Sequence, residues 1–127
     1  MIDHVSVGVR DLGKSAAFYT DCFKALGYTL QHQDNTQAVF GKNGAWSFIV
    51  YPAAAEAMLN GDRTHIAFTA ESEAAVQDCY QIALELGAAS LRAPGNRPDI
   101  NEQYYGAMFK DLDQHTLEIV HWKAGAG

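Results

Sequence analysis

Three residues with metal-binding side chains, His4, His65 and Glu118, lie in separate segments that each alternate apolar and polar residues. Alternation with a period of two predicts half-buried β-strands, whose successive side chains point to opposite faces. In each segment the ionisable residue lies on the face opposite the bulky apolar residues. We therefore expect the two imidazoles and the carboxylate to face one common cavity.

A divalent cation would explain why these three groups converge. A carboxylate is costly to bury without a partner, and two histidines with one carboxylate can hold one side of an ion while leaving positions open for substrate. Such ligands suit iron, manganese, zinc, nickel and cobalt alike. The sequence therefore predicts one divalent metal ion of undetermined identity. The alternative for each histidine taken alone is a structural residue with no ligand role.

The elements that would position these residues occur twice along the chain. Each copy is expected to contain a strand, a helix and three further strands. Asp11 can cap the first helix, Ser72 or Glu71 can open the second, and a glycine follows each. The expected strands are residues 4–9, 28–33, 36–41, 46–51, 64–70, 89–94, 103–110 and 115–122, and the expected helices are residues 13–26 and 72–86.

The two copies also correspond residue by residue: DHVSV matches THIAF, DCF matches DCY, and WSFIV matches TLEIV. One such module cannot bury both faces of its sheet. We therefore predict an α+β fold in which two βαβββ modules form a curved eight-stranded mixed sheet, with a concave metal or ligand cleft and the helices on the convex side. The single domain 1–127 would comprise a first module at about 1–52, a linker at 53–63, a second module at about 64–123 and a flexible tail at 124–127.

The composition is that of one ordinary globular domain, with 127 residues, 48% of them hydrophobic and 19% charged. A net charge of −6 would repel phosphate groups, so neither nucleic acid nor a membrane surface is expected as a partner. No apolar run approaches the roughly 20 residues that span a bilayer, and the N-terminus lacks signal-peptide features, so a cytoplasmic location is expected. Cys22 and Cys79 are expected to be buried free thiols.

The paired modules, the RDL…S…FY run at 10–19 and D-x-D-x-H-x-L-E at 111–118 resemble the vicinal oxygen chelate superfamily. That superfamily includes glyoxalase I, extradiol dioxygenases, fosfomycin-inactivating enzymes and bleomycin-binding proteins. The resemblance covers essentially the whole chain. It implies metal ligands on the first and last strands of each module, which match His4, His65 and Glu118.

The fourth ligand position implied by the resemblance matches Phe48, through the alignment of WSFIV with TLEIV. Phenylalanine cannot bind a metal, so the ligand set is similar to those of extradiol dioxygenases and fosfomycin enzymes rather than to that of glyoxalase I. The resemblance also implies a homodimer, with each cavity built from one chain or from two.

Several further residues are candidates for contact with a small-molecule substrate. Alternation counted back from Asp111 turns Tyr104 toward the cavity, or Tyr105 if the strand holds a bulge. Arg97 lies in a proline-flanked loop where a guanidinium could bind a carboxylate or phosphate. The alternative is that Arg97 is solvated and that the tyrosines are core aromatics. The candidate substrate-binding residues are Ser6, Phe48, Thr69, Arg97, Tyr104, Tyr105 and Met108, and the candidate catalytic residues are Glu118 and Tyr104.

These residues support two functional hypotheses. The first is a metal-dependent enzyme, glyoxalase-like or dioxygenase-like, that acts on a small molecule chelated through two adjacent oxygens by lyase or isomerase, dioxygenase or thiol-transferase chemistry. The second is a metal-free, bleomycin-resistance-like protein that binds a small molecule in an aromatic groove. Trp46, Phe48, Tyr104 and Trp122 would line that groove.

Overall fold

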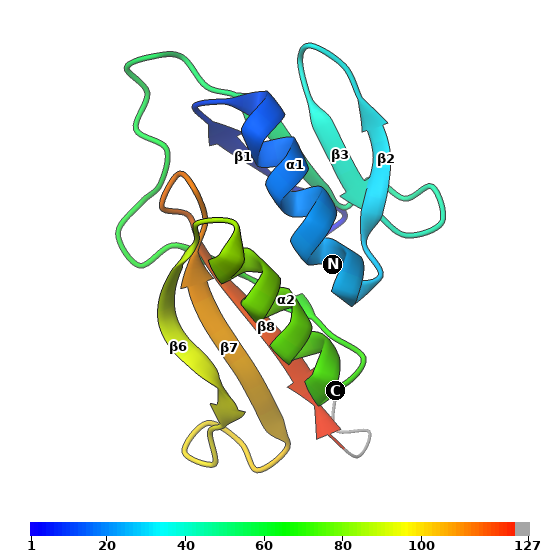
Figure 1. Ribbon diagram of the computed structural model, residues 1–127, viewed down its shortest axis with the longest axis vertical. Coiled ribbons are helices and arrows are strands. Elements are labelled where there is room, and N and C mark those ends of the chain that lie inside the picture. Colours follow the sequence, from blue (N-terminus) through cyan, green and yellow to red (C-terminus); the bar gives the residue numbers. More distant parts are fainter. Residues whose placement is uncertain (124–127) are drawn as a thin grey trace.

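The computed structural model describes residues 1–123, which fold into two βαβββ modules (Figure 1). The first module contains β1 (Val5–Val9), α1 (Leu12–Phe23), the short 3-10 helix η1 (Lys24–Leu26), β2 (Thr29–Gln33), β3 (Ala38–Gly41) and β4 (Phe48–Pro52). The second contains β5 (His65–Thr69), α2 (Glu73–Glu85), β6 (Ala89–Asn96), β7 (Tyr104–Lys110) and β8 (Thr116–Trp122). The predicted succession of elements is confirmed, and the tail expected at 124–127 lies outside the described residues.

The strands form two separate four-stranded sheets, in the orders β1-β4-β3-β2 and β5-β8-β7-β6. In each sheet the first and last strands of the module pair in parallel and the other neighbours are antiparallel. The prediction of one continuous eight-stranded sheet is therefore wrong, because β1 and β5 each end a sheet of their own. A repeated sequence predicts two equivalent modules but does not determine which strand edges pair. A cleft shared by all eight strands stays a prediction.

The helices begin and end where local chemistry predicts. The side chain of Asp11 accepts the backbone N–H of Lys14 at the start of α1, and Ser72 accepts that of Ala75 at the start of α2. Gly27 ends the first helical segment at a φ of +78°, a left-handed conformation that favours glycine. Figure 1 shows α1 and α2 side by side on one face of the molecule, each beside its own sheet.

The hydrophobic core is shared between the modules through the helices and the edge strands. Phe23 of α1 packs against Phe68 of β5, with ring centroids 4.7 Å apart, and Phe48 of β4 lies 5.2 Å from the same ring. Cys22 and Cys79 are fully buried free thiols, as predicted, and burial raises the pKa of Cys22. Within residues 1–123 no helix has both the length and the apolar character needed to cross a membrane.

The D-x-D-x-H motif at 111–115 joins the modules. The buried carboxylate of Asp111 accepts hydrogen bonds from the hydroxyl of Tyr19 in α1 and from the backbone N–H groups of Asp113 and His115. The His115 ring in turn donates from Nε2 to the carbonyl oxygen of Gly8 at 2.7 Å. The residues that carry the sequence resemblance at this point therefore hold the two modules together.

The linker between the modules is held by Arg10, which follows β1. Its guanidinium donates to the carbonyl oxygens of Ala54 and Ala55 at 3.0 Å each and of Ala57 at 2.6 Å. Figure 1 shows this linker running along one side of the molecule, from the end of β4 to the start of β5. Arg10 of the RDL run therefore helps to hold the linker in its path between the modules.

Replacing Tyr19 with phenylalanine is expected to flatten the alkaline loss of stability. Burial, and next the charge of Asp111 and the hydrogen bond to it, raise the pKa of Tyr19 well above its ordinary value of 10.0. The folded protein keeps this proton while the unfolded chain releases it above pH 10, so the free energy of unfolding falls as the pH rises through that value. Urea unfolding at pH 9 and at pH 11 should give the wild type a loss in the free energy of unfolding that is larger by about 1.4 kcal/mol over the whole interval. Exposed Tyr51, changed to phenylalanine, should leave this loss unchanged; equal losses for the two variants would contradict the prediction.

Candidate functional site

His65 and Glu118 come together on the second sheet, on the face turned away from α2. Glu118 lies opposite Ala67 in the parallel ladder of β8 with β5, and its neighbours Leu117 and Ile119 point into the hydrophobic core. The Nε2 atom of His65 lies 3.2 Å from Oε1 of Glu118. The glutamate side chain is 15% exposed and the histidine 46% exposed, so the pair is sheltered but still reachable.

Tyr104 of β7 and Arg92 of β6 extend this pair. The hydroxyl of Tyr104 donates to Oε2 of Glu118 at 2.7 Å, and Nη2 of Arg92 donates to the same hydroxyl. The same Nη2 atom lies 3.8 Å from Oε2 of Glu118. The ring of Trp122 packs edge-on against Tyr104, with centroids 5.7 Å apart. We call His65, Arg92, Tyr104 and Glu118 the polar cluster.

The protonation of Tyr104 is determined by its surroundings. Burial, followed by the hydrogen bond to Glu118 and the charge of that carboxylate, raises the pKa of Tyr104 to about 12, although Arg92 acts in the opposite direction. The phenol is therefore protonated at neutral pH. Because a guanidinium can only donate, the Tyr104 oxygen accepts from Arg92 while its proton points to Glu118.

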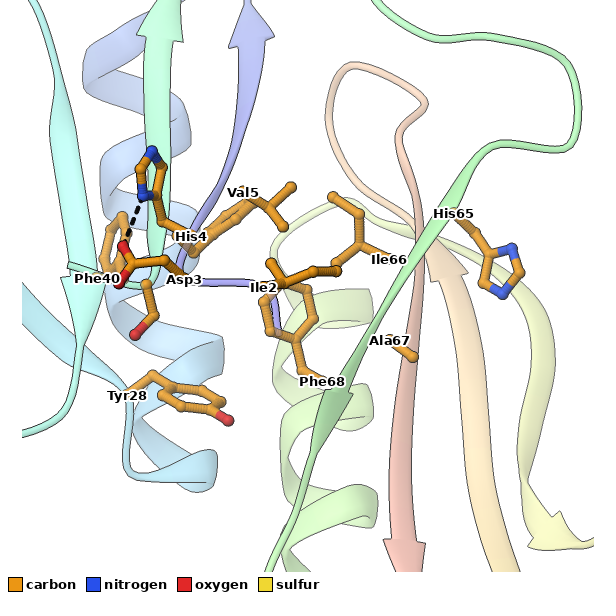
Figure 2. A pocket seen from close by; sticks show the side chains of 12 residues that line it. Ile2, Asp3, His4, Val5, Tyr28, Phe40, His65, Ile66, Ala67 and Phe68 are labelled. Carbon is orange, nitrogen blue, oxygen red and sulfur yellow. Dashed lines mark hydrogen bonds and ion pairs between the residues drawn. The ribbon is translucent and has the colours of Figure 1, made fainter. Parts of the chain in front are cut away.

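His4 lies apart from the polar cluster, immediately before β1 of the first sheet. Figure 2 shows His4 and His65 on opposite sides of a pocket of about 480 Å³, with their rings directed away from each other and Ile2 and Ile66 between them. The Nδ1 atom of His4 lies 2.8 Å from Oδ1 of Asp3, and the histidine side chain is 54% exposed. One chain therefore brings together two of the three predicted ligands but not the third.

Two members of the polar cluster, His65 and Glu118, have the side chains and the spacing of metal ligands. Two ligands that lie at right angles about 2.1 Å from one ion are about 3 Å apart, which is close to the 3.2 Å between His65 and Glu118. Their nitrogen and oxygen donors suit a divalent transition metal. Within residues 1–123, however, no three His, Cys, Asp or Glu side chains lie close enough to hold an ion together. The pair therefore fits a metal ion as two ligands, and any third ligand would lie outside this group.

The strand register corrects the fourth ligand position. Glu118 lies opposite Ala67, and Ser6, which is the counterpart of Ala67, lies opposite Ile49. Ile49 rather than Phe48 is therefore the structural equivalent of Glu118. Phe48 belongs to the buried core and is 2% exposed. The sequence alignment was one residue out of register because both segments are largely apolar, and neither residue can bind a metal.

Three other predicted residues lie on or beside the open sheet faces. Met108 lies opposite Glu118 in the antiparallel ladder of β7 with β8 and so shares its face. The hydroxyl oxygen of Thr69 is 3.2 Å from that of Tyr28. Ser6 is exposed on β1 and lines a smaller pocket of about 280 Å³ beside β5.

Arg97 and Tyr105 lie outside the polar cluster. The Nε and Nη2 atoms of Arg97 bind the two carboxylate oxygens of Asp99 at 2.8 and 2.6 Å. The hydroxyl of Tyr105 accepts a hydrogen bond from Gln77 of α2 at 2.8 Å, so this ring faces the helical layer. Strand β7 carries Tyr104, and not Tyr105, on the face of Glu118.

The aromatic residues expected for a metal-free groove do not form one surface. Trp46 is 44% exposed and stacks on His32 in the first module, with centroids 5.4 Å apart. Phe48 lies in the core, while Tyr104 and Trp122 pair on the second sheet. The four side chains therefore lie in three separate places.

Sequence reasoning missed Arg92 because β6 is irregular. The pairing of β6 with β7 shifts register between Ser90 and Arg92 and again between Arg92 and Gly95. A count of alternating residues fails across such shifts. The only feature of the sequence that could have indicated Arg92 was its cationic side chain in β6, the strand that pairs with the strand of Tyr104.

Comparison with known proteins agrees with this architecture. The family model of the Glyoxalase/Bleomycin resistance protein/Dioxygenase superfamily matches residues 1–119. The chain belongs to this superfamily. The expected membership and the two βαβββ modules of this glyoxalase superfamily protein are thereby confirmed. No curated protein sequence gave a match.

Solved structures of other members of the glyoxalase superfamily have the same fold. A glyoxalase/bleomycin resistance protein from Albidiferax ferrireducens T118 is 23% identical, with 95% of this chain and 98% of that chain covered and a TM-score of 0.85. A glyoxalase-related enzyme from Fulvimarina pelagi is 19% identical, with 99% and 93% covered and a TM-score of 0.73. A fosfomycin resistance protein from Listeria monocytogenes is 21% identical, with 98% and 94% covered and a TM-score of 0.71. At these identities the likeness establishes the fold alone.

Proposed function

We propose that this protein is a divalent-metal-dependent enzyme, glyoxalase-like or dioxygenase-like, that acts on a small molecule bound through two adjacent oxygens. The observation that carries the proposal is the pair of His65 and Glu118, 3.2 Å apart on an open sheet face. Lyase or isomerase, dioxygenase and thiol-transfer reactions all fit a site that binds vicinal oxygens, and the proposal covers these classes.

The residues have separate roles in this proposal. His65 and Glu118 hold the ion, which supplies Lewis-acid stabilisation of negative charge on substrate oxygens. Tyr104 holds Glu118 through its 2.7 Å hydrogen bond. Met108 flanks the same face beside Glu118. Ile49 provides no carboxylate, so the proposal assigns no proton transfer to that strand.

The third ligand in this proposal is His4 of a second copy of the chain. His4 is 54% exposed and turned away from His65 of its own chain (Figure 2), which leaves it free to meet another molecule. In a twofold homodimer each first module would approach the second module of the other chain, and two equivalent sites would form. The open faces of both sheets would then bound a shared cleft.

A hybrid dimer tests both parts of the proposal. Two differently tagged copies, one His4→Ala and one Glu118→Ala, are coexpressed, purified through both tags, loaded with Mn²⁺, Co²⁺ or Zn²⁺, and analysed for metal content. The wild type is expected to hold one ion per chain and each variant homodimer almost none. The hybrid should hold about half the wild-type content, because one of its two sites combines an intact His4 with an intact Glu118 from the other chain.

The matched control is His32→Ala. His32, like His4, is well exposed and lies 2.8 Å from an aspartate oxygen, so its loss should leave the metal content unchanged. An empty hybrid beside a loaded wild type would mean that the site is not shared between chains. A wild type that binds none of the three ions would contradict the metal-dependent enzyme. The metal-free binding protein would then be favoured if ligand binding were insensitive to chelators.

A further inference from the structure

The two oxygens of the Glu118 carboxylate have different partners. Oε1 lies 3.2 Å from Nε2 of His65, the other proposed metal ligand. Oε2 accepts the hydroxyl proton of Tyr104 at 2.7 Å and lies 3.8 Å from Nη2 of Arg92. One oxygen therefore faces the place where an ion would be bound, while the other is engaged by its neighbours.

Arg92 determines the direction of the hydrogen bond to Oε2. Its Nη2 donates to the Tyr104 hydroxyl oxygen, and a guanidinium has no acceptor to offer in return. The single hydroxyl proton of Tyr104 is therefore directed to Glu118. The order of donation runs from Arg92 to Tyr104 to Glu118.

This arrangement is sheltered from competing water. Tyr104 is 2% exposed as a residue, and the side chains of Arg92 and Glu118 are 24% and 15% exposed. The arginine is also placed at a cost, because its Nε atom is buried with no hydrogen-bond partner among the described residues. A buried donor without a hydrogen-bond partner destabilises the folded state. Local costs of this kind are typical of functional positions.

We propose that Arg92 and Tyr104 are positioning residues that hold Glu118 as a one-oxygen ligand. With Oε2 engaged by Tyr104, only Oε1 would be available to an ion, so the carboxylate would occupy one coordination position rather than two. A substrate that chelates through two adjacent oxygens needs two such positions. The inference rests on the proposed metal site. It assigns to Arg92 alone among the residues of β6 the role of positioning Glu118 through Tyr104.

The coordination of Co²⁺ in apo protein loaded with that ion tests the proposal without any substrate. Tyr104→Phe and Arg92→Met should release Oε2 to the ion, raise the coordination number and weaken the visible absorption of Co²⁺, which is sensitive to geometry. Loss of such supporting contacts should also weaken Co²⁺ binding by about 10–100-fold. Arg92→Lys keeps a cationic donor and should restore most of the wild-type absorption.

Lys110→Met is the matched control, because Lys110 is a cation on the same face of the same sheet but pairs with Thr116. The positioning role would be overturned if the Co²⁺ absorption spectra of Arg92→Met and Tyr104→Phe matched the spectrum of the wild type, as that of Lys110→Met should. A wild type that binds no Co²⁺ would overturn the metal site itself, and the inference with it. Circular dichroism of each variant separates loss of metal coordination from loss of fold. If Arg92→Met does not fold, Tyr104→Phe, which removes only one oxygen atom, decides the test.

Discussion

Replacing Asp111 with alanine is expected to lower the free energy of unfolding by about 4 kcal/mol, because two buried donors and one part-buried donor lose their acceptor. The donors are the Tyr19 hydroxyl and the backbone N–H groups of Asp113 and His115, the last two at 2.9 and 2.8 Å. Asp111 is 3% exposed, so water cannot take the place of its carboxylate. Urea unfolding followed by circular dichroism measures the change.

Two further variants make this prediction specific to the module junction. Asp21→Ala removes an exposed aspartate of α1 and should change the free energy of unfolding by less than about 0.5 kcal/mol. Asp111→Asn keeps one acceptor oxygen for the two backbone groups and should fall between the wild type and Asp111→Ala. A loss below about 1 kcal/mol for Asp111→Ala would mean that the junction contributes little to stability.

Replacing Gly106 with alanine is expected to displace Tyr104 from Glu118. The added methyl group would lie 2.5 Å from the Tyr104 hydroxyl oxygen and 2.7 Å from the carbonyl oxygen of Ile119. The tyrosine can rotate away, but the carbonyl belongs to the sheet, so we expect a loss of about 2–3 kcal/mol in stability as well. Trp122 packs 5.7 Å from the tyrosine ring, and its fluorescence should report the displacement.

Gly95→Ala is the control for this substitution. Gly95 lies opposite Gly106 in the ladder of β6 with β7, yet the nearest atom to an added methyl group is 4.0 Å away. This variant should leave Trp122 fluorescence unchanged and stability equal or slightly higher, because alanine restricts the unfolded chain. If Gly95→Ala and Gly106→Ala changed Trp122 fluorescence and stability equally, the position of Tyr104 would not depend on the absence of a side chain at Gly106.

The sequence predicted those parts of the site that lie on regular strands. Glu118 and Tyr104 could be assigned to one face by alternation, since β7 and β8 pair without a register shift. Arg92 could not be assigned in this way, because β6 is irregular on both sides of it. The sequence alignment paired Phe48 rather than Ile49 with Glu118, an error of one position, because an apolar strand offers no polar residue to fix its register.

The arrangement of the modules was the part of the fold that the sequence did not determine. Repetition predicted two equal modules, but pairing between their edge strands depends on surfaces that a pattern does not describe. The Tyr19 and Asp111 motifs contributed to the family resemblance, yet their contact could not be found from sequence because they are far apart in the chain. Hydrogen bonding between these residues became evident only from the folded structure.

The strand order also determines how each module assembles. β1 and β5 pair on one side only, with strands about 40–50 positions further along the chain, since Val5 meets Phe48 and His65 meets Thr116. Pairings this distant in sequence close late in folding, after the local hairpins have formed. Their amides should also be among the first to open in the native state. We therefore expect β1, which follows His4, and β5, which begins at His65, to be the last strands to join their sheets, and an ion bound at the proposed site would stabilise them.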